Sequence, residues 1–375
     1  MRYFLITLGI ITGVLLLLLV GVAIYIHSRK NIRDEHDLER SLTQVVDKWY
    51  RSEKNTGLAL VAVKNGRACF LNRGTRSKIS KELIDSNSLF ELASVTKLFT
   101  AAVTQLLADS GVVALDDRMA DYLAGKVALS PKAKNTTLRH LATHSSGFPR
   151  LPDSLLARMT NEWDPYAALT TADLYRYLET CEGKEEEGVF GYSNFGMGLL
   201  GHLLELRTGR SYEALVQSQL LQPLAMNHTC ISLTPAARQK LVQGYNEKDK
   251  ASGVWHNPVL AGAGSFLSST ADMRLFLEAG LGGDAAINHS LQQLQRSQGD
   301  AELATGWMTP NAWNIINGLD HMVWHNGVSG GYGSFIALDT QSKTGIVILS
   351  NKARDMDGLG FRLMSVLASQ SWKNP

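Results

Sequence analysis

The sequence predicts an α+β fold, in which the two ends of one domain share an antiparallel sheet and the middle of the chain is mainly helical. Apolar, strand-like runs occur near the start of the domain, at Leu58 to Val63 and Ala68 to Leu71. Two more occur near its end, at Phe335 to Leu338 and Ile346 to Leu349. Residues from about 91 to 250, between these pairs, are helix-rich in pattern. Strands and helices that are segregated along the chain, rather than alternating, are typical of the α+β class.

A helix precedes this sheet and another follows it. Five apolar side chains recur at helical spacing before the first strand and form one stripe: Leu38, Leu42, Val45, Val46 and Trp49. The segment from Ala353 to Trp372 is interpreted as a second helix, which covers the sheet.

Each strand pair contains a polar turn. Lys64-Asn65-Gly66 separates the first two runs, and Asp339 to Lys343 separates the last two. Asn-Gly pairs and short polar gaps between apolar runs are typical of hairpins. We therefore interpret both Lys64-Asn65-Gly66 and Lys343-Thr344-Gly345 as structural turns.

An apolar run without a charged residue extends from Tyr3 to Ile26. A helix of that length would be about 36 Å long, enough to span a bilayer. The run is long for the apolar part of a signal peptide, and no convincing small-x-small cleavage pattern follows it. We expect a transmembrane signal anchor at residues 1–28, a juxtamembrane segment and first helix at 29–56, and one globular domain at 57–375 with a helical lobe at about 91–250.

Composition excludes several classes of function. The formal net charge of the 375-residue chain is +2, and no basic stripe suits a nucleic acid. Cys69, Cys181 and Cys230 have neither metal-ligand nor redox spacing, so one disulfide or three packed thiols remain open, with the thiols favoured. No internal repeat appears, and the acidic run Glu185-Glu186-Glu187 is interpreted as a solvated loop.

Ser94-Val95-Thr96-Lys97 is the only Ser-x-x-Lys in the chain. Residues three apart on a helix face the same side, so Ser94 and Lys97 are expected to lie next to each other. A serine hydroxyl is a weak nucleophile until a neighbouring base takes its proton, and a neutral lysine can be that base. Such a pair indicates acyl transfer through a covalent serine intermediate.

Two further boxes follow in the order that such a site requires. Tyr192-Ser193-Asn194 is the only Tyr-x-Asn. His325-Asn326-Gly327 precedes a glycine-rich stretch, Gly327 to Gly333, and then a strand. Because the other two Lys-x-Gly matches are interpreted as turns, His325 is the predicted third-box residue.

The three boxes, and the segments around them, resemble the serine β-lactamases and penicillin-recognising DD-peptidases, in particular the class C-like β-lactamase-related hydrolases. The resemblance covers residues 57 to 372 and includes Phe90 to Thr100, Thr137 to Pro149, Gly191 to Gly201, Ala261 to Thr270 and His325 to Asn351. It implies a sheet flanked by helices plus an all-helical lobe, with the active site between them.

The family resemblance also implies roles for individual residues. Ser94 would attack a carbonyl, and Lys97 with Tyr192 would pass the proton to the leaving group. The backbone N–H groups of Ser94 and Val328 would form the oxyanion hole.

The substrate would be held by Asn194, His325 and Gly327, with Asn194 on its amide carbonyl. His325 would face the substrate carboxylate or assist Tyr192. Since this box more often carries Lys, a His is expected to make the charge pH-dependent near neutrality. It also makes the chain more similar to the D-amino-acid peptidases and some DD-peptidases than to efficient β-lactamases.

The expected substrate is therefore a D-amino-acid peptide, with a β-lactam or an ester as alternatives and a penicillin-binding sensor without turnover as a second class. No cofactor is expected. His140 and His144 are four apart on an expected helix, as metal ligands can be, but no further ligand cluster accompanies them and no metal is predicted.

Membrane topology has opposing indications. Arg29, Lys30 and Arg33 outnumber Arg2 across the apolar run, which alone would favour a cytoplasmic domain. Long domains translocate regardless of such charges, and the resembling enzymes act on cell-wall-like substrates outside the cytoplasm. We expect a single-pass protein of the inner (cytoplasmic) membrane, with its domain in the periplasm or otherwise outside the cytoplasm.

Overall fold

The computed structural model describes residues 38–53, 57–182, 188–283, 285–296, 304–370 and 372. The expected signal anchor at residues 1–28 lies outside these ranges. Within them, no helix is long and apolar enough to cross a membrane.

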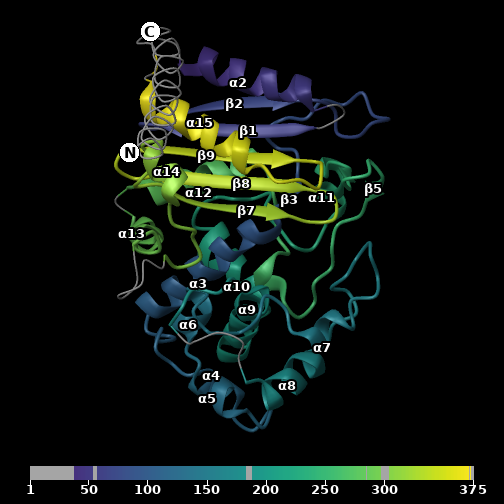
Figure 1. Ribbon diagram of the computed structural model, residues 1–375, viewed down its shortest axis with the longest axis vertical. Coiled ribbons are helices and arrows are strands. Elements are labelled where there is room, and N and C mark those ends of the chain that lie inside the picture. The colour runs from purple at the N-terminus through teal and green to yellow at the C-terminus, as the bar shows by residue number, and fades with distance from the viewer. Residues whose placement is uncertain are drawn as a thin grey trace, which may run out of the picture.

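A five-stranded antiparallel sheet joins the two ends of the domain. Four of its strands correspond to the predicted apolar runs, and the fifth, β7, was not predicted. The strand order is β2-β1-β9-β8-β7 (Figure 1). The bounds are β1 (Leu58–Lys64), β2 (Arg67–Arg73), β7 (Val323–Val328), β8 (Gly333–Asp339) and β9 (Thr344–Ser350). The central strands β1, β9 and β8 are buried along their whole length, so the sheet is covered on both faces.

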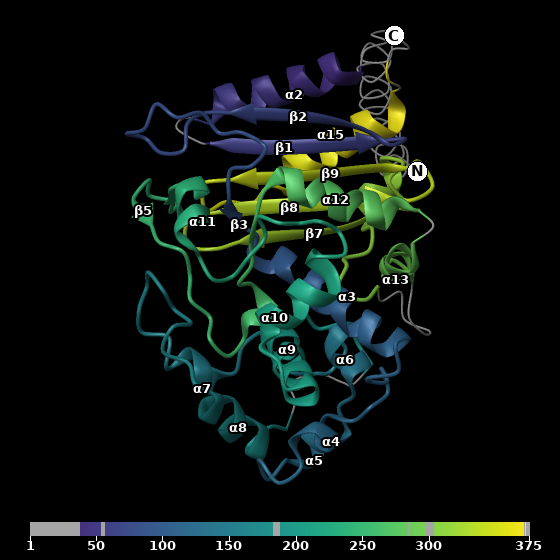
Figure 2. The ribbon, with the colours of Figure 1, turned by 180° about the vertical axis from the view of Figure 1, so that it is seen from behind.

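The sheet separates two hydrophobic cores, and helices cover each of its faces. α15 (Asp357–Ser369), the predicted covering helix, lies on one face and α12 (Thr270–Leu281) lies on the other, as Figures 1 and 2 show. α2 (Leu38–Ser52), which was predicted as a helix without an assigned face, packs in the same hydrophobic core as α15. Alternate residues of one strand enter different cores: Leu60 packs with the α2 and α15 side, and Val61 with the α12 side.

Both predicted turns are confirmed. Asn65 and Gly66 connect β1 to β2 with φ angles of 50° and 76°, the left-handed values that a tight hairpin turn requires. Lys343 ends the β8–β9 connection with a φ of 48°. The ammonium group of Lys64 donates to the carbonyl of Leu367 at the end of α15.

The helical lobe lies beyond the β7 edge of the sheet (Figure 1). In chain order, the remaining described elements are β3 (Phe90–Glu91), η1 (Ala93–Val95), α3 (Thr96–Asp109), α4 (Met119–Leu123), α5 (Pro131–Asn135), α6 (Leu138–Ala142), α7 (Asp153–Leu156), α8 (Thr171–Thr180), α9 (Asn194–Thr208), α10 (Tyr212–Val216), the π-helical turn η2 (Gln217–Leu221), α11 (Pro235–Lys240), β4 (Gly244–Tyr245), β5 (Ala251–Ser252), η3 (Ala261–Ala263), β6 (Leu267–Ser268), α13 (Ala286–Gln293) and α14 (Ala312–Ile316).

The structure places the two histidines and the three cysteines that the sequence analysis discussed. His140 and His144 do not share a helix, because α6 ends at Ala142 and His144 has a left-handed φ of 57°; the expectation of a common helix was wrong. The three cysteines, Cys69, Cys181 and Cys230, are free thiols.

The packing of α15 on the sheet predicts opposite effects at two glycines of that helix. A Cβ on Gly360 would lie 2.3 Å from the ring of Phe335, whereas a Cβ on Gly358 would meet nothing within 4 Å. We expect Gly360→Ala to lower the free energy of unfolding by about 1–3 kcal/mol through overpacking. Gly358→Ala, the matched control, should be neutral or stabilising by up to about 1 kcal/mol. Urea unfolding would measure both, and equal effects would contradict this packing.

Candidate active site

Ser94 lies on a sharp turn between the sheet and the helical lobe. Ala93 has a φ of 46°, which non-glycine residues rarely adopt, so the backbone bends just before Ser94. Ser94 itself is in the short 3₁₀ turn η1, and Lys97 is in the first turn of α3, which continues directly from η1. The two residues were expected on one helix; they lie instead across this junction, still side by side.

Lys97 is a buried base in contact with Ser94. Its Nζ atom lies 3.0 Å from Ser94 Oγ and donates to the carbonyl of Ala263 in η3 at 2.6 Å. The side chain is fully buried. Desolvation, and secondly the charge of Arg150, holds the pKa of Lys97 well below its ordinary value. An uncharged amine within hydrogen-bonding distance can accept the proton of Ser94.

Tyr192 completes a compact group around Ser94. It hydrogen-bonds with Ser94, and its ring lies 5.1 Å from Lys97 Nζ. Burial raises the pKa of Tyr192 to about 12, so the phenol keeps its proton at neutral pH. A neutral phenol next to a neutral amine can relay a proton without creating a buried charge at rest.

His325 lies in β7, with its ring 6.0 Å from the ring of Tyr192. The residue is 1% exposed, and burial, followed by the proximity of Lys97, lowers the pKa of His325 to about 3. The expectation that its charge would change near neutral pH was therefore wrong. A sequence shows the residue type, but only burial decides its charge.

The tautomer of His325 follows from one hydrogen bond. Nδ1 lies 2.6 Å from the carbonyl oxygen of Asn326, and because a carbonyl can only accept, Nδ1 carries the proton. Nε2 is then an unprotonated acceptor; it is buried, and it has no hydrogen-bond partner among the residues that the structure describes. Two roles were predicted for His325: to face the substrate carboxylate or to assist Tyr192. The lone pair on Nε2 can accept from the hydroxyl of Tyr192 or from an ammonium group, whereas it would repel a carboxylate.

Asn194 is the first residue of α9 and lies next to this group. It is 8% exposed, it hydrogen-bonds with the phenol of Tyr166, and its Oδ1 atom is buried without a partner. An unpaired buried amide oxygen at the edge of a site is an acceptor available to a substrate N–H.

The end of β7 lies against the backbone of Ser94. A Cβ on Gly327 would be 2.8 Å from the Ser94 nitrogen and 2.5 Å from the Leu92 carbonyl oxygen, so only glycine fits there. Val328 follows as the last residue of β7, and 44% of its side chain is exposed.

Sequence reasoning missed the positioning contacts of His144. Its ring packs on Tyr192 with centroids 4.6 Å apart, and its Nδ1 accepts from the backbone N–H of Ser193 at 3.1 Å. Burial, followed by the charges of Lys97 and His325, holds the pKa of His144 far below its ordinary value. The residue lies within a recognised segment, but nothing in the sequence indicated that its left-handed backbone would direct the ring to Tyr192.

Glu91 was also missed. Its buried carboxylate accepts from the Trp255 backbone N–H at 2.7 Å and from Ser329 Oγ at 2.5 Å. Burial raises the pKa of Glu91 to about 7. The side chain thus connects β3, three residues before Ser94, with loops from two distant parts of the chain.

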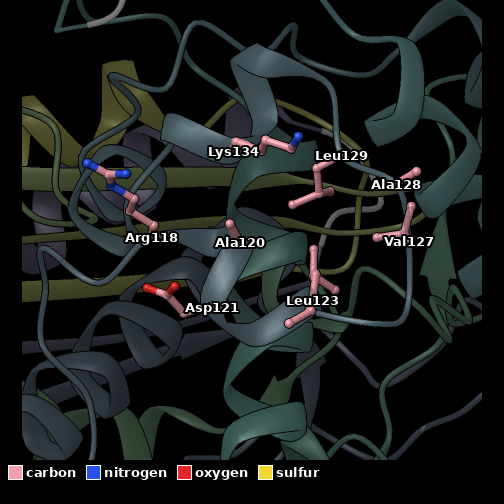
Figure 3. Close-up of a pocket in the computed structure, with 9 residues that line it drawn as sticks. Arg118, Ala120, Asp121, Leu123, Val127, Ala128, Leu129 and Lys134 are labelled. Carbon is pink, nitrogen blue, oxygen red and sulfur yellow. The ribbon is translucent and has the colours of Figure 1, made fainter.

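A separate hollow of about 480 Å³ opens at the far end of the helical lobe, at α4 and α5 (Figure 3). Its lining is mainly short or apolar, with Arg118, Asp121 and Lys134 as its charged residues. None of the residues around Ser94 lines it.

Comparisons with known sequences agree with this geometry. A family model described as Beta-lactamase matches residues 38–368. A β-lactamase of Pseudomonas fluorescens is 26% identical over 356 residues, which span 84% of this chain and 94% of the relative. A β-lactamase of Escherichia coli (strain K12) is 28% identical over 356 residues, which span 84% of this chain and 88% of the relative.

Comparisons with solved structures show the same fold. A protein of Pseudomonas syringae described as β-lactamase/D-alanine carboxypeptidase superimposes with a TM-score of 0.77 at 23% identity, covering 90% of this chain and 99% of that one. A class C β-lactamase of Rhodobacter sphaeroides gives a TM-score of 0.73 at 22% identity, covering 87% and 97%.

The burial of His325 predicts a pH dependence of stability. Its pKa is about 3 in the folded protein and near 6.5 when the chain is unfolded, so below pH 6.5 the unfolded state binds a proton that the folded state does not. The free energy of unfolding should therefore fall with falling pH, with His325 contributing up to about 1.4 kcal/mol per pH unit. His325→Gln should reduce this slope between pH 6.5 and 4.5 in urea titrations. His289→Gln, at an exposed position of α13, is the control, and identical slopes in wild type and His325→Gln would show that His325 is not held neutral.

Proposed function

Because the chain belongs to the Beta-lactamase family, and is thus a serine hydrolase as the motifs indicated, we propose that Ser94 cleaves peptides containing D-amino acids through an acyl-enzyme. The observation that carries this proposal is the fully buried, uncharged Lys97 amine 3.0 Å from Ser94 Oγ.

Acylation begins with the transfer of the Ser94 proton to Lys97. The Ser94 oxygen attacks the substrate carbonyl as the amine becomes an ammonium. That ammonium forms in a buried site, where the carbonyl oxygen of Ala263 accepts a hydrogen bond from it. Tyr192, which hydrogen-bonds with Ser94, passes its proton to the leaving amine and takes the proton held by the Lys97 ammonium, so both side chains return to their neutral forms.

The backbone N–H groups of Ser94 and Val328 stabilise the oxyanion in this mechanism. Support comes from the close approach of β7 to Ser94, which the absence of a side chain at Gly327 permits. Deacylation reverses the roles: a water molecule gives its proton to the restored base, attacks the ester, and Ser94 leaves with a proton.

One observation favours a D-amino-acid peptide over a β-lactam as the substrate. The third box carries a neutral acceptor, His325, where the family more commonly has a lysine cation, and such a box resembles that of D-amino-acid peptidases and some DD-peptidases. Asn194 Oδ1, which has no partner among the described residues, can accept from an amide N–H of either substrate class. β-Lactam hydrolysis is the second candidate, because the Pseudomonas fluorescens and Escherichia coli relatives carry that name. Esters remain a further alternative.

The protein is proposed to act at the membrane. Its apolar segment from Tyr3 to Ile26 would anchor it, with the hydrolase domain outside the cytoplasm. A C-terminal alkaline phosphatase fusion should then be active, and an inactive fusion beside an active cytosolic reporter would contradict this topology.

Acyl-enzyme formation can be tested with benzylpenicillin and the full-length protein in detergent. Intact-mass spectrometry should show a lasting adduct on the wild type and none on Ser94→Ala, and the wild type should release D-alanine from D-alanyl-D-alanine peptides. Rapid loss of the drug without an adduct would indicate a β-lactamase instead. An intact drug, no adduct and no peptide cleavage would overturn the peptidase proposal.

The choice of the third box is tested by two substitutions. His325→Ala should lower kcat/KM by about 10²-fold or more, as expected for removing a group that assists proton transfer. Lys343→Ala, in the exposed turn between β8 and β9, should change kcat/KM less than twofold. The reverse result would identify Lys343-Thr344-Gly345 as the functional box.

A further inference from the structure

Arg150 is an exposed cation at the edge of the candidate active site. Its guanidinium carbon lies 5.0 Å from the centroid of the Tyr192 ring. No carboxylate in the described ranges of the chain forms an ion pair with it. The segment from Arg150 to Tyr177 carries no sequence motif, so the family boxes did not indicate this residue.

The position of Arg150 is built into the Tyr192-Ser193-Asn194 box. Ser193 Oγ donates to the carbonyl of Pro149 at 2.7 Å, and the Phe195 backbone N–H donates to the carbonyl of Arg150 at 3.1 Å. Two hydrogen bonds thus hold the backbone at Arg150 against the start of α9. The guanidinium group is therefore presented beside Tyr192 by a fixed backbone rather than by a free loop.

Arg150 acts electrostatically on the whole site. After burial, its charge helps to lower the pKa of Lys97 and, more weakly, that of His144. It opposes the rise in pKa that burial causes at Tyr192 and Tyr166. Since burial keeps Lys97 and His144 uncharged, the resting site presents the permanent positive charge of Arg150 to an approaching ligand.

Neighbouring contacts relate Arg150 to Asn194. The charge of Arg150 acts on Tyr166, whose phenol hydrogen-bonds with Asn194, the residue proposed to hold the amide of the acyl group. Tyr166 in turn packs on Trp255, with ring centroids 5.6 Å apart, so two aromatic side chains lie together here. His325, by contrast, is neutral and lies on β7.

We propose that Arg150 binds a carboxylate on the acyl group of the substrate, so that the preferred substrates are D-amino-acid peptides with an acidic acyl portion. A guanidinium group stacked on an aromatic ring keeps its N–H edge free for a two-point contact with a carboxylate. This inference rests on the proposed peptidase function and adds the substrate class.

Two matched peptides test the proposal with the full-length protein. N-glutaryl-D-alanyl-D-alanine ends its acyl chain in a carboxylate, and N-(4-carbamoylbutanoyl)-D-alanyl-D-alanine ends it in an amide of similar shape. The wild type should prefer the acid on the order of tenfold in kcat/KM for D-alanine release, as for a charge-assisted hydrogen bond. Arg150→Ala should bring this ratio close to one, and Arg150→Lys should retain part of it.

The ratio is the informative quantity, because Arg150 also acts on Lys97 and its loss will change the turnover of both peptides. Arg238→Ala is the control: it removes an exposed positive charge from α11, away from Ser94, and should leave the ratio unaltered. A ratio in Arg150→Ala within twofold of the wild-type value would overturn the proposal.

A second readout separates this inference from the peptidase function. (Glutarylamino)methylboronic acid and its carboxamide bind a nucleophilic serine without turnover, so their inhibition constants against acylation by benzylpenicillin report Arg150 directly. Tenfold tighter inhibition by the acid, lost in Arg150→Ala, would support the role of Arg150 even if neither peptide were cleaved. Equal inhibition by the two compounds would reject it even if both were.

Discussion

The Lys97 amine lies in the protein interior 3.0 Å from the Ser94 hydroxyl, with no ion-pairing carboxylate among the described residues, and the rest of the site depends on this arrangement. An unpaired ammonium group in such a place would be costly, so burial favours the uncharged amine, the form that the proposed base requires. The same burial keeps His144 and His325 neutral. Burial in one region between the sheet and the helical lobe thus determines the protonation of three side chains.

This buried region is formed by segments that are distant in the chain. α3 contributes Lys97, η3 the carbonyl that the amine contacts, and β7 the strand that carries His325. Glu91 links β3 to the loops that contain Trp255 and Ser329, so the nucleophile turn and the end of β7 are tied by one carboxylate. His144 gives the Tyr192 ring a packing surface. These contacts preorganise the group, which limits the reorganisation that proton transfer requires.

Much of the fold followed from pattern. The two strand pairs, their polar turns, the amphipathic helix at residues 38 to 49 and the C-terminal helix were all predicted, because burial on a sheet or helix face imposes a period that is visible in the sequence. The junction at Ser94 was less visible. Its 3₁₀ geometry depends on the left-handed Ala93, for which the sequence offers no signal such as glycine.

The sequence by itself determined the family and the α+β architecture and predicted the three boxes, since these depend on residue type, order and periodicity. Only the tertiary structure decided the charge of His325, the contact between His144 and Tyr192, and the position beside the site of Arg150, which forms no ion pair with the other described residues. Charge state depends on desolvation, and desolvation is produced by packing between segments that are remote in the chain. For that reason His325, which was expected to titrate near neutral pH, is a buried, neutral acceptor. Arg150, the cation beside Tyr192, comes from a segment without a motif.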